Sequence, residues 1–214
     1  LEHLNRHNEA LACYQQASKL NPQREWYWYN QANVLMLLER NDEARQTLQS
    51  ALERNPKHAR SWALLSGLLR ANQQIQEALE ANRKATQYAP DQAWSWGELG
   101  QTLHALGHYD DALLAYQKAA ALTQHNAHYL IRQADALVAL RRTVEALDLL
   151  EHVVHKNPRS ALGWAKHGHA LRKLERLEAA LSSLGKATQI DPHHAYAWGE
   201  RGLVLSMLGQ HDDA

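Results

Sequence analysis

The sequence predicts an all-α fold, an α-α superhelix or solenoid made of stacked antiparallel helical hairpins of 34 residues each. Three residue types recur with this period, and repeats of roughly 20–50 residues are typical of solenoids. Alanine occupies every 34th position from Ala10 to Ala214. All five prolines lie on a second grid of the same period, at Pro22, Pro56, Pro90, Pro158 and Pro192. A third grid carries Trp28, Trp62, Trp96, Leu130, Trp164 and Trp198.

Each unit contains two amphipathic helical segments, as residues 93–126 show. Apolar or small residues recur at helical spacing from 96 to 106 and again from 112 to 119, so each segment has one apolar face. Gly107 stands where a helix ends in a left-handed residue, and Asp110 offers a side-chain oxygen to the next helix N-terminus. In most units a proline then ends the second segment, because it disfavours α geometry in the residue before it. No stretch alternates strictly between apolar and polar residues, so we expect no strands.

The grids also set the expected organisation of the chain. Residues 1–214 are expected to form a single array, because the units follow one another without a break. Both ends fall inside a unit and residue 1 is leucine, so we expect a segment of a longer array that lacks its natural N-terminus. The five complete units are 25–58, 59–92, 93–126, 127–160 and 161–194, and the partial units are 1–24 and 195–214.

These units resemble the tetratricopeptide repeat family. The family signature is Trp, two residues, Leu-Gly, two residues, Tyr, then Ala, three residues, an aromatic residue and finally Pro. Leu103 replaces the expected Tyr and Gln124 the expected Pro in the unit 93–126, which otherwise matches at Trp96, Leu99, Gly100, Ala112 and Tyr116. The resemblance covers the whole chain. It implies that the first helix of each unit lines the concave surface of a right-handed superhelix.

One hairpin cannot bury its apolar face alone, so neighbouring units must serve as each other's core. We expect the tryptophans to be mainly core residues. Asn82 stands where other units carry Tyr or Leu, and a buried amide without partners costs about 1–3 kcal/mol, so we expect a weak spot or a local polar contact there. Small residues should allow close helix contacts at Ala32, Ser66, Gly100, Ala134, Gly168 and Gly202.

The unit 127–160 and the turn that enters it depart from the pattern at several positions. Neutral drift with compensating packing would explain the departures, and so would a local change in superhelical pitch. The replaced positions are Gln124, Leu130, Arg141, Arg142 and Val153.

Composition narrows the classes of partner. Lys and Arg number 23, and so do Asp and Glu, so the net charge is zero with histidine neutral. This balance argues against nucleic acid and against a membrane surface as partners. No apolar run approaches the roughly 18–20 residues needed to cross a bilayer. Cys13 is the single cysteine, which excludes an internal disulfide and fits a reducing, cytoplasmic location.

The sequence offers no catalytic or metal-binding constellation. The fourteen histidines include close pairs, but zinc sites usually need three or four ligands. Glycine-rich phosphate loops and paired acid–base carboxylates are also lacking, and Cys13 has no candidate base. We therefore expect no enzyme activity, no metal and no cofactor.

The resemblance maps groove-facing positions onto the first helices. These positions carry six Lys or Arg and three Asp or Glu, a net charge of +3, and the cations concentrate in the later units. They predict a groove for a protein or peptide with an aromatic or apolar portion and an acidic portion, with a merely solvated face as the alternative. The candidate binding residues are Trp26, Tyr29, Asn30, Asn33, Arg60, Arg70, Trp94, Glu98, Gln101, His128, Arg132, Lys166, His169, Arg172, Lys173 and Tyr196. The same face carries Met36, Leu64, His104, Asp135, Glu200, Ser206 and Met207.

Two partner modes known for the family do not fit this sequence. The carboxylate clamp for chaperone tails and the asparagine ladder both need Asn at one position of the first helix. This position carries Asn30 in one unit, and in the other units it carries Leu64, Glu98, Arg132, Lys166 or Glu200.

Three functions stay open. They are an interaction scaffold, a recognition or regulatory part of a larger enzyme or signalling protein, and an oligomerisation module. The last would follow if the ends exposed Leu1, Leu4, Leu205 and Leu208.

Overall fold

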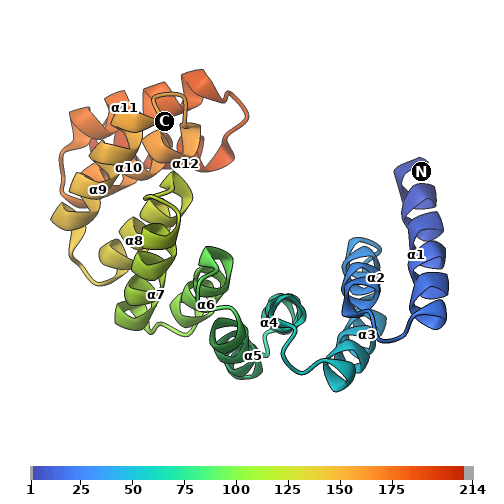
Figure 1. Ribbon diagram of the computed structural model, residues 1–214. Helices are drawn as coiled ribbons and strands as arrows, with labels where there is room; N and C mark the ends of the chain where they lie inside the picture. The colour runs from blue at the N-terminus through green and yellow to red at the C-terminus, as the bar shows by residue number, and fades with distance from the viewer. Residues whose placement is uncertain (1, 210–214) are drawn as a thin grey trace. The chain divides into compact units, whose positions relative to one another are not determined.

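The chain is an all-α solenoid of antiparallel helical hairpins (Figure 1). The computed structural model describes the backbone of residues 2–209 and the side chains of residues 6–209, in which it has twelve helices and no strand. Residues 1–107 and 108–214 form two compact units. The first unit contains α1 (Glu2–Leu20), α2 (Glu25–Leu37), α3 (Asn41–Arg54), α4 (Ala59–Ala71), α5 (Ile75–Tyr88) and α6 (Ala93–Ala105). The second contains α7 (Tyr109–Leu122), α8 (Ala127–Ala139), α9 (Thr143–Lys156), α10 (Ala161–Lys173), α11 (Leu177–Ile190) and α12 (Ala195–Met207).

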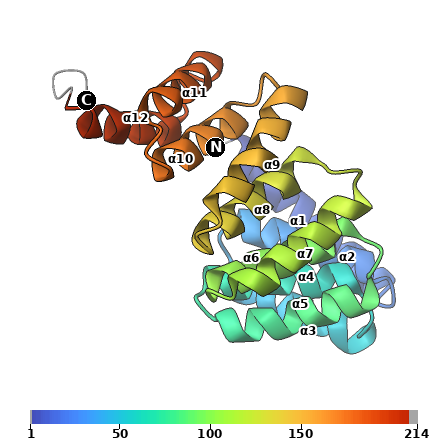
Figure 2. The same ribbon diagram turned by 90° about the vertical axis from the view of Figure 1, so that its left-hand side faces the viewer.

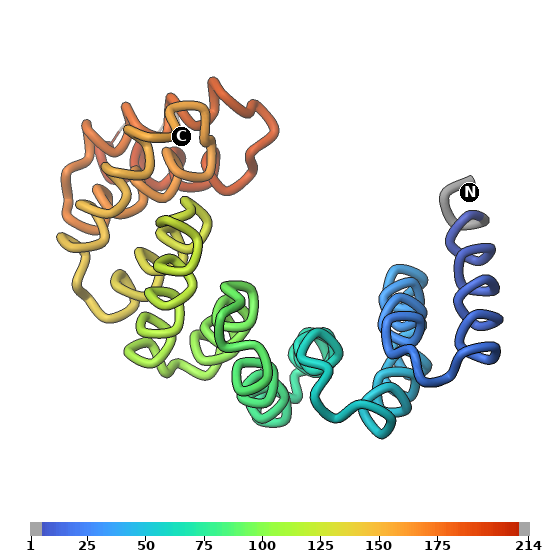
Figure 3. The backbone as a smooth tube through the Cα atoms, viewed as in Figure 1, coloured from blue at the N-terminus to red at the C-terminus, as the bar shows by residue number. Residues whose placement is uncertain are grey.

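Within each unit, every helix packs against its neighbours in the sequence. The pairs α2–α3, α4–α5, α8–α9 and α10–α11 form hairpins in which the second helix runs back along the first (Figure 3). The first helices of successive hairpins also touch, so that α4 contacts α2 and α6, and α10 contacts α8 and α12. Figure 2 shows this side-by-side packing for α10, α11 and α12. Each unit therefore presents a row of first helices on one side.

Small residues occupy the helix contacts, as the sequence predicted. Ala44, Ala78, Ala112, Ala146 and Ala180 are fully buried in the second helices. Gly168 is the clearest case in a first helix, because a Cβ there would lie 2.6 Å from the Leu184 side chain. Gly202 is only half-buried.

The turn inside each hairpin uses a left-handed residue, also with a 34-residue period. Gly107 has φ +78°, as expected, and the equivalent positions are Glu39, Gln73, Arg141, Glu175 and Gly209. The cap expected at Asp110 is wrong. Helix α7 begins at Tyr109, so Asp110 already lies in its first turn, and the N-cap residue is His108, without a side-chain hydrogen bond.

The repeated tryptophans lie at the edge of the core and not inside it. Trp62 and Trp164 pack against buried clusters while staying partly exposed, so the expectation of core residues holds only in part. Trp28, Trp62, Trp96 and Trp164 are half-buried, and Trp198 is exposed. In each, the indole Nε1 donates to the carbonyl oxygen of the proline six residues earlier, at 2.7–3.0 Å. Basic side chains also lie over rings of this set, with Arg54, Lys84 and Lys186 at 4.1–4.3 Å from the centroid and Arg201 over Trp198 at 5.2 Å. The tryptophan and proline grids therefore reflect one shared contact.

The repeat 127–160 and the turn before it lack both partners of this contact, the tryptophan and the proline. Leu130 is buried in place of the tryptophan. Gln124 and His125 have φ values of +51° and +63°, which a proline ring cannot adopt. The turn before α8 is therefore rebuilt, and Asn126 caps α8 by accepting a hydrogen bond from the backbone N–H of His128.

The oligomerisation hypothesis named residues near both ends. Leu1 and Leu4 lie outside the described side chains. Leu205 is buried and Leu208 half-buried. The large apolar and aromatic side chains that α12 exposes are Tyr196, Trp198, Leu203 and Met207.

Candidate functional site

The candidate residues lie on the first helices, and none of the sixteen is fully buried. Each unit has its own set, because the first unit ends at Gly107. The exposed ones are Trp26, Asn33, Arg60, His128, Lys173 and Tyr196. The half-buried ones are Tyr29, Asn30, Arg70, Trp94, Glu98, Gln101, Arg132, Lys166, His169 and Arg172.

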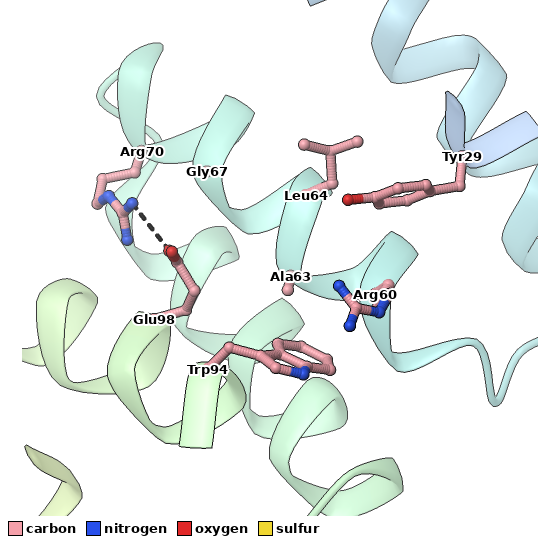
Figure 4. A pocket seen from close by; sticks show the side chains of 8 residues that line it. All are labelled: Tyr29, Arg60, Ala63, Leu64, Gly67, Arg70, Trp94 and Glu98. Atoms are coloured by element: carbon pink, nitrogen blue, oxygen red, sulfur yellow. Dashed lines mark hydrogen bonds and ion pairs between the residues drawn. The ribbon is translucent and has the colours of Figure 1, made fainter. Parts of the chain in front are cut away.

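In the first unit, five candidates surround one pocket of about 240 Å³ between α2, α4 and α6 (Figure 4). Tyr29 enters from α2, and its ring points towards Leu64. Helix α4 forms the floor of the pocket through Ala63 and Gly67, the two smallest residues of the lining. The full lining is Tyr29, Arg60, Ala63, Leu64, Gly67, Arg70, Trp94 and Glu98.

Arg70 at the edge of this pocket is held by its neighbours on α6. Its guanidinium donates to Glu98 Oε2 at 3.0 Å and to Thr102 Oγ1 at 3.1 Å. The buried Asn82 also donates to Thr102 Oγ1, at 2.7 Å, and to the Glu98 carbonyl oxygen, at 3.1 Å. The local polar contact expected at Asn82 is therefore confirmed. This network neutralises Arg70 and fixes α6 against α4 and α5.

Arg60, by contrast, has no acid partner among the described residues. Its guanidinium lies over the Trp94 ring, 5.1 Å from the centroid, which is cation–π geometry. The indole Nε1 of Trp94 is enclosed and has no hydrogen-bond acceptor. Nearby, burial lowers the pKa of His58; the charge of Glu25 opposes this effect, and the charge of Arg60 adds a smaller lowering. The positive charge of Arg60 therefore stays unmatched at the pocket.

In the second unit, ion pairs join the candidate residues across successive first helices. Lys166 Nζ lies 2.8 Å from Asp135 Oδ1 on α8, and Arg132 lies 3.8 Å from the same carboxylate. Lys166 also lies over the ring of Tyr196, at 4.7 Å from the centroid. Burial, and then the Glu200 and Asp135 carboxylates, raise the pKa of Tyr196.

Glu200 on α12 forms the second link of this unit. Arg172 Nε and His169 Nδ1 both lie 2.9 Å from Glu200 Oε2, and the Glu200 side chain is only 8% exposed. Burial alone would raise the pKa of Glu200. The hydrogen bonds and charges of His169 and Arg172 outweigh this effect and lower it to about 2.

These links correct the expectation of a cationic later section open to a partner. Lys166 and Arg172 neutralise acids of the same fold, so they are not free cations. Sequence counting could give the charge of the face but not its pairing, because pairing depends on how neighbouring helices are offset. Arg60, Arg132 and Lys173 carry the remaining positive charge.

Other candidates are not drawn into these clusters. Trp26 makes edge-to-face contacts with Tyr14 and Tyr27, at 5.9 and 5.6 Å between centroids. The side chain of Asn30 donates to its own helix backbone, at Trp26 O.

The pocket residues that the sequence did not single out are Ala63 and Gly67. The only signal for these two residues in the sequence is that both are small and lie one helical turn apart. Helix packing produces the same pattern.

Among the residues that the structure describes, no group of three His, Cys, Asp or Glu could hold a metal ion. No described helix is long and apolar enough to span a membrane.

Comparison with known proteins gives three sequence matches of one kind. Family models described as tetratricopeptide repeat match residues 3–68, 93–126 and 165–214. Compared with curated proteins, the chain has no match.

Solved structures with the same fold are distant in sequence. YrrB is 23% identical with a TM-score of 0.68, over 87% of this chain and 96% of that one. PilF of Pseudomonas aeruginosa is 16% identical with a TM-score of 0.72, over 96% of this chain and 87% of that one. Yeast Tom70 is 16% identical with a TM-score of 0.72, over 94% of this chain but only 43% of that one. At these identities the likeness concerns the fold.

The repeat matches and the hairpin geometry agree. The matched stretches cover most of the sequence and include helices of both compact units. The chain belongs to the tetratricopeptide repeat family.

Proposed function

We propose that this chain is a protein-interaction scaffold that binds a peptide or protein partner across the first helices of its hairpins. The observation that carries the proposal is the pocket between α2, α4 and α6, which gathers Tyr29, Arg60 and Trp94 from three successive first helices. Large aromatic residues and Arg are enriched among the side chains that dominate binding energy at interfaces. A partner lying across these helices would contact all three.

The buried residues of the second helices support this choice of face. Positions such as Leu48 and Leu150 are fully buried in the packing of the hairpins. First-helix side chains leave partly exposed aromatic and polar groups in both units. The structure of YrrB, which shares the fold, is described as a TPR protein with an unusual peptide-binding site. A peptide is therefore the first class of partner to test.

The test is selection of a displayed library of random 12-residue peptides on the 214-residue chain. Selected peptides are then synthesised, and their Kd is measured by fluorescence anisotropy. We expect Tyr29→Ala or Tyr196→Ala, one in each compact unit, to weaken binding at least about tenfold, because Tyr is a frequent binding hot spot.

The matched control is Tyr88→Ala. Tyr88 ends the second helix α5 and is 36% exposed, close to the 37% of Tyr196. Its removal should leave Kd unchanged. Failure to select any binding peptide would overturn the proposal, and so would peptides that respond to Tyr88→Ala but to neither first-helix variant. Circular dichroism checks that each variant is folded.

A further inference from the structure

The floor of the α2–α4–α6 pocket is open because α4 presents only small side chains there. A Cβ added at Gly67 would have no heavy atom within 4 Å outside its own helix. Ala63 lies one turn earlier on the same face of α4. The pocket volume of about 240 Å³ is below the roughly 300–1,000 Å³ of small-molecule sites. It therefore suits a single side chain of a larger partner.

The walls of the pocket are apolar and aromatic. Leu64 and the Tyr29 ring form one side, and the Trp94 ring forms the other (Figure 4). An aliphatic or aromatic side chain placed between them would have both of its faces removed from water. Burial of apolar surface is the main favourable term in association. A charged side chain in this space would lose hydration without such a gain.

The polar groups at the pocket favour an anion beside that side chain. Glu98 is matched by Arg70, whose two donating nitrogens already have acceptors. Among the described residues, Arg60 has neither an acid partner nor a hydrogen-bond acceptor, and its guanidinium lies over the Trp94 ring. The lining thus carries one unmatched positive charge. An Arg edge binds a carboxylate through two parallel N–H···O bonds.

We infer that this pocket recognises an acidic peptide segment, with an aliphatic or aromatic side chain between Tyr29 and Trp94 and an adjacent carboxylate on Arg60. The inference rests on the proposed function, because it names the partner chemistry of the same face. The carboxylate is either that of an Asp or Glu side chain or the C-terminal one. This arrangement differs from an Asn-based clamp, since a single Arg stacked on a Trp holds the anion.

Two variants test the inference on the full chain with the selected peptides. Arg60→Gln removes the charge, and Gly67→Leu adds a side chain at the floor, where its Cβ meets no heavy atom within 4 Å. Each has a matched control. Arg54→Gln removes a similar cation stacked on Trp28, 4.3 Å from the ring centroid, outside the pocket. Gly185→Leu adds the same side chain at another helical glycine with open space.

We expect Arg60→Gln and Gly67→Leu each to weaken the binding of acidic peptides at least tenfold, and both control variants to leave Kd unchanged. Peptides with Glu or Asp replaced by the amide, or with the apolar residue replaced by Ala, should bind the native chain at least tenfold more weakly. Against an amide peptide, Arg60→Gln should have no further effect. C-terminal amidation distinguishes the source, since it weakens binding only where the terminal carboxylate is the one recognised.

If Arg60→Gln and Gly67→Leu left the Kd of the selected peptides unchanged while Tyr196→Ala raised it, this inference would be overturned and the proposed function would stand. A chain that selects no peptide would instead remove the proposed function. An equal loss with Arg54→Gln would also overturn the inference, because the effect would then be one of general charge. Melting temperatures confirm that Gly67→Leu is folded.

Discussion

Single residues in the hairpin turns show where this fold carries local strain. The left-handed position recurs at six places, but glycine fills only Gly107 and Gly209. The others hold Glu, Gln or Arg, and the left-handed conformation costs an L-residue roughly 1–2 kcal/mol through contact of its Cβ with the backbone. The period fixes the backbone conformation more strictly than it fixes the residue.

Gln73→Gly should therefore stabilise the chain by about 0.5–1 kcal/mol, the order of the strain it removes less the entropy that Gly loses on folding. Urea denaturation followed by circular dichroism measures the change. The control is Gln46→Gly, the same substitution at an exposed position in the interior of α3. It should destabilise by about 0.7–1 kcal/mol, because Gly is a poor helix former. Equal signs for the two variants would contradict the strain argument.

At the scale of helices, ion pairs tie one first helix to the next. Arg70 on α4 pairs with Glu98 on α6, and Arg172 on α10 pairs with Glu200 on α12. Both pairs join the twelfth residue of one first helix to the sixth of the next. Residues 28 apart in the sequence thus become neighbours, a spacing that no pattern within a single helix would suggest.

Glu200→Gln tests what such a link contributes. The pKa of Glu200 lies at about 2 in the folded chain, below its ordinary 4.5, so folding favours the ionised form. Its contribution is present in full above pH 4.5 and is lost as the pH falls towards 2. By 1.36 kcal/mol per pKa unit, it amounts to roughly 2–4 kcal/mol.

We expect Glu200→Gln to lower the free energy of unfolding at pH 7 by that amount and to flatten its pH dependence between pH 4.5 and 2. Denaturant titrations at a series of pH values measure both effects. Asp148→Asn is the control, an exposed acid on α9 in the same unit. A pH profile for Glu200→Gln that runs parallel to the native one would show that the link is weak.

The helices themselves could be read from the sequence, because the repeat period and the apolar faces depend on local spacing. What could not be read depends on contacts between helices. Gln124 was visible as a missing proline, but the two left-handed residues of its turn were not. Gly67 and the packing residue Gly168 are the same residue type in the sequence. Only the neighbouring helices show that Gly67 faces open space and Gly168 faces Leu184.

At the scale of the whole molecule, the array is a chain of local contacts. Within each compact unit, a helix packs on its sequence neighbours, and the first helices of successive hairpins also touch. In such repeat proteins stability is approximately a sum over units and their nearest neighbours. A substitution should therefore weaken its own surroundings before it affects distant repeats.

Leu48→Ala and Leu150→Ala test this locality as a matched pair. The two leucines occupy the same repeat position, on α3 and α9, and both are fully buried. Each substitution should cost about 2–5 kcal/mol locally. Hydrogen exchange measured by mass spectrometry should show lost protection in α2–α5 for Leu48→Ala and in α8–α11 for Leu150→Ala, with the other group unchanged. If either variant exposed both groups equally, the chain would unfold as one cooperative block, and energetic coupling along the array would have to reach well beyond the nearest repeat.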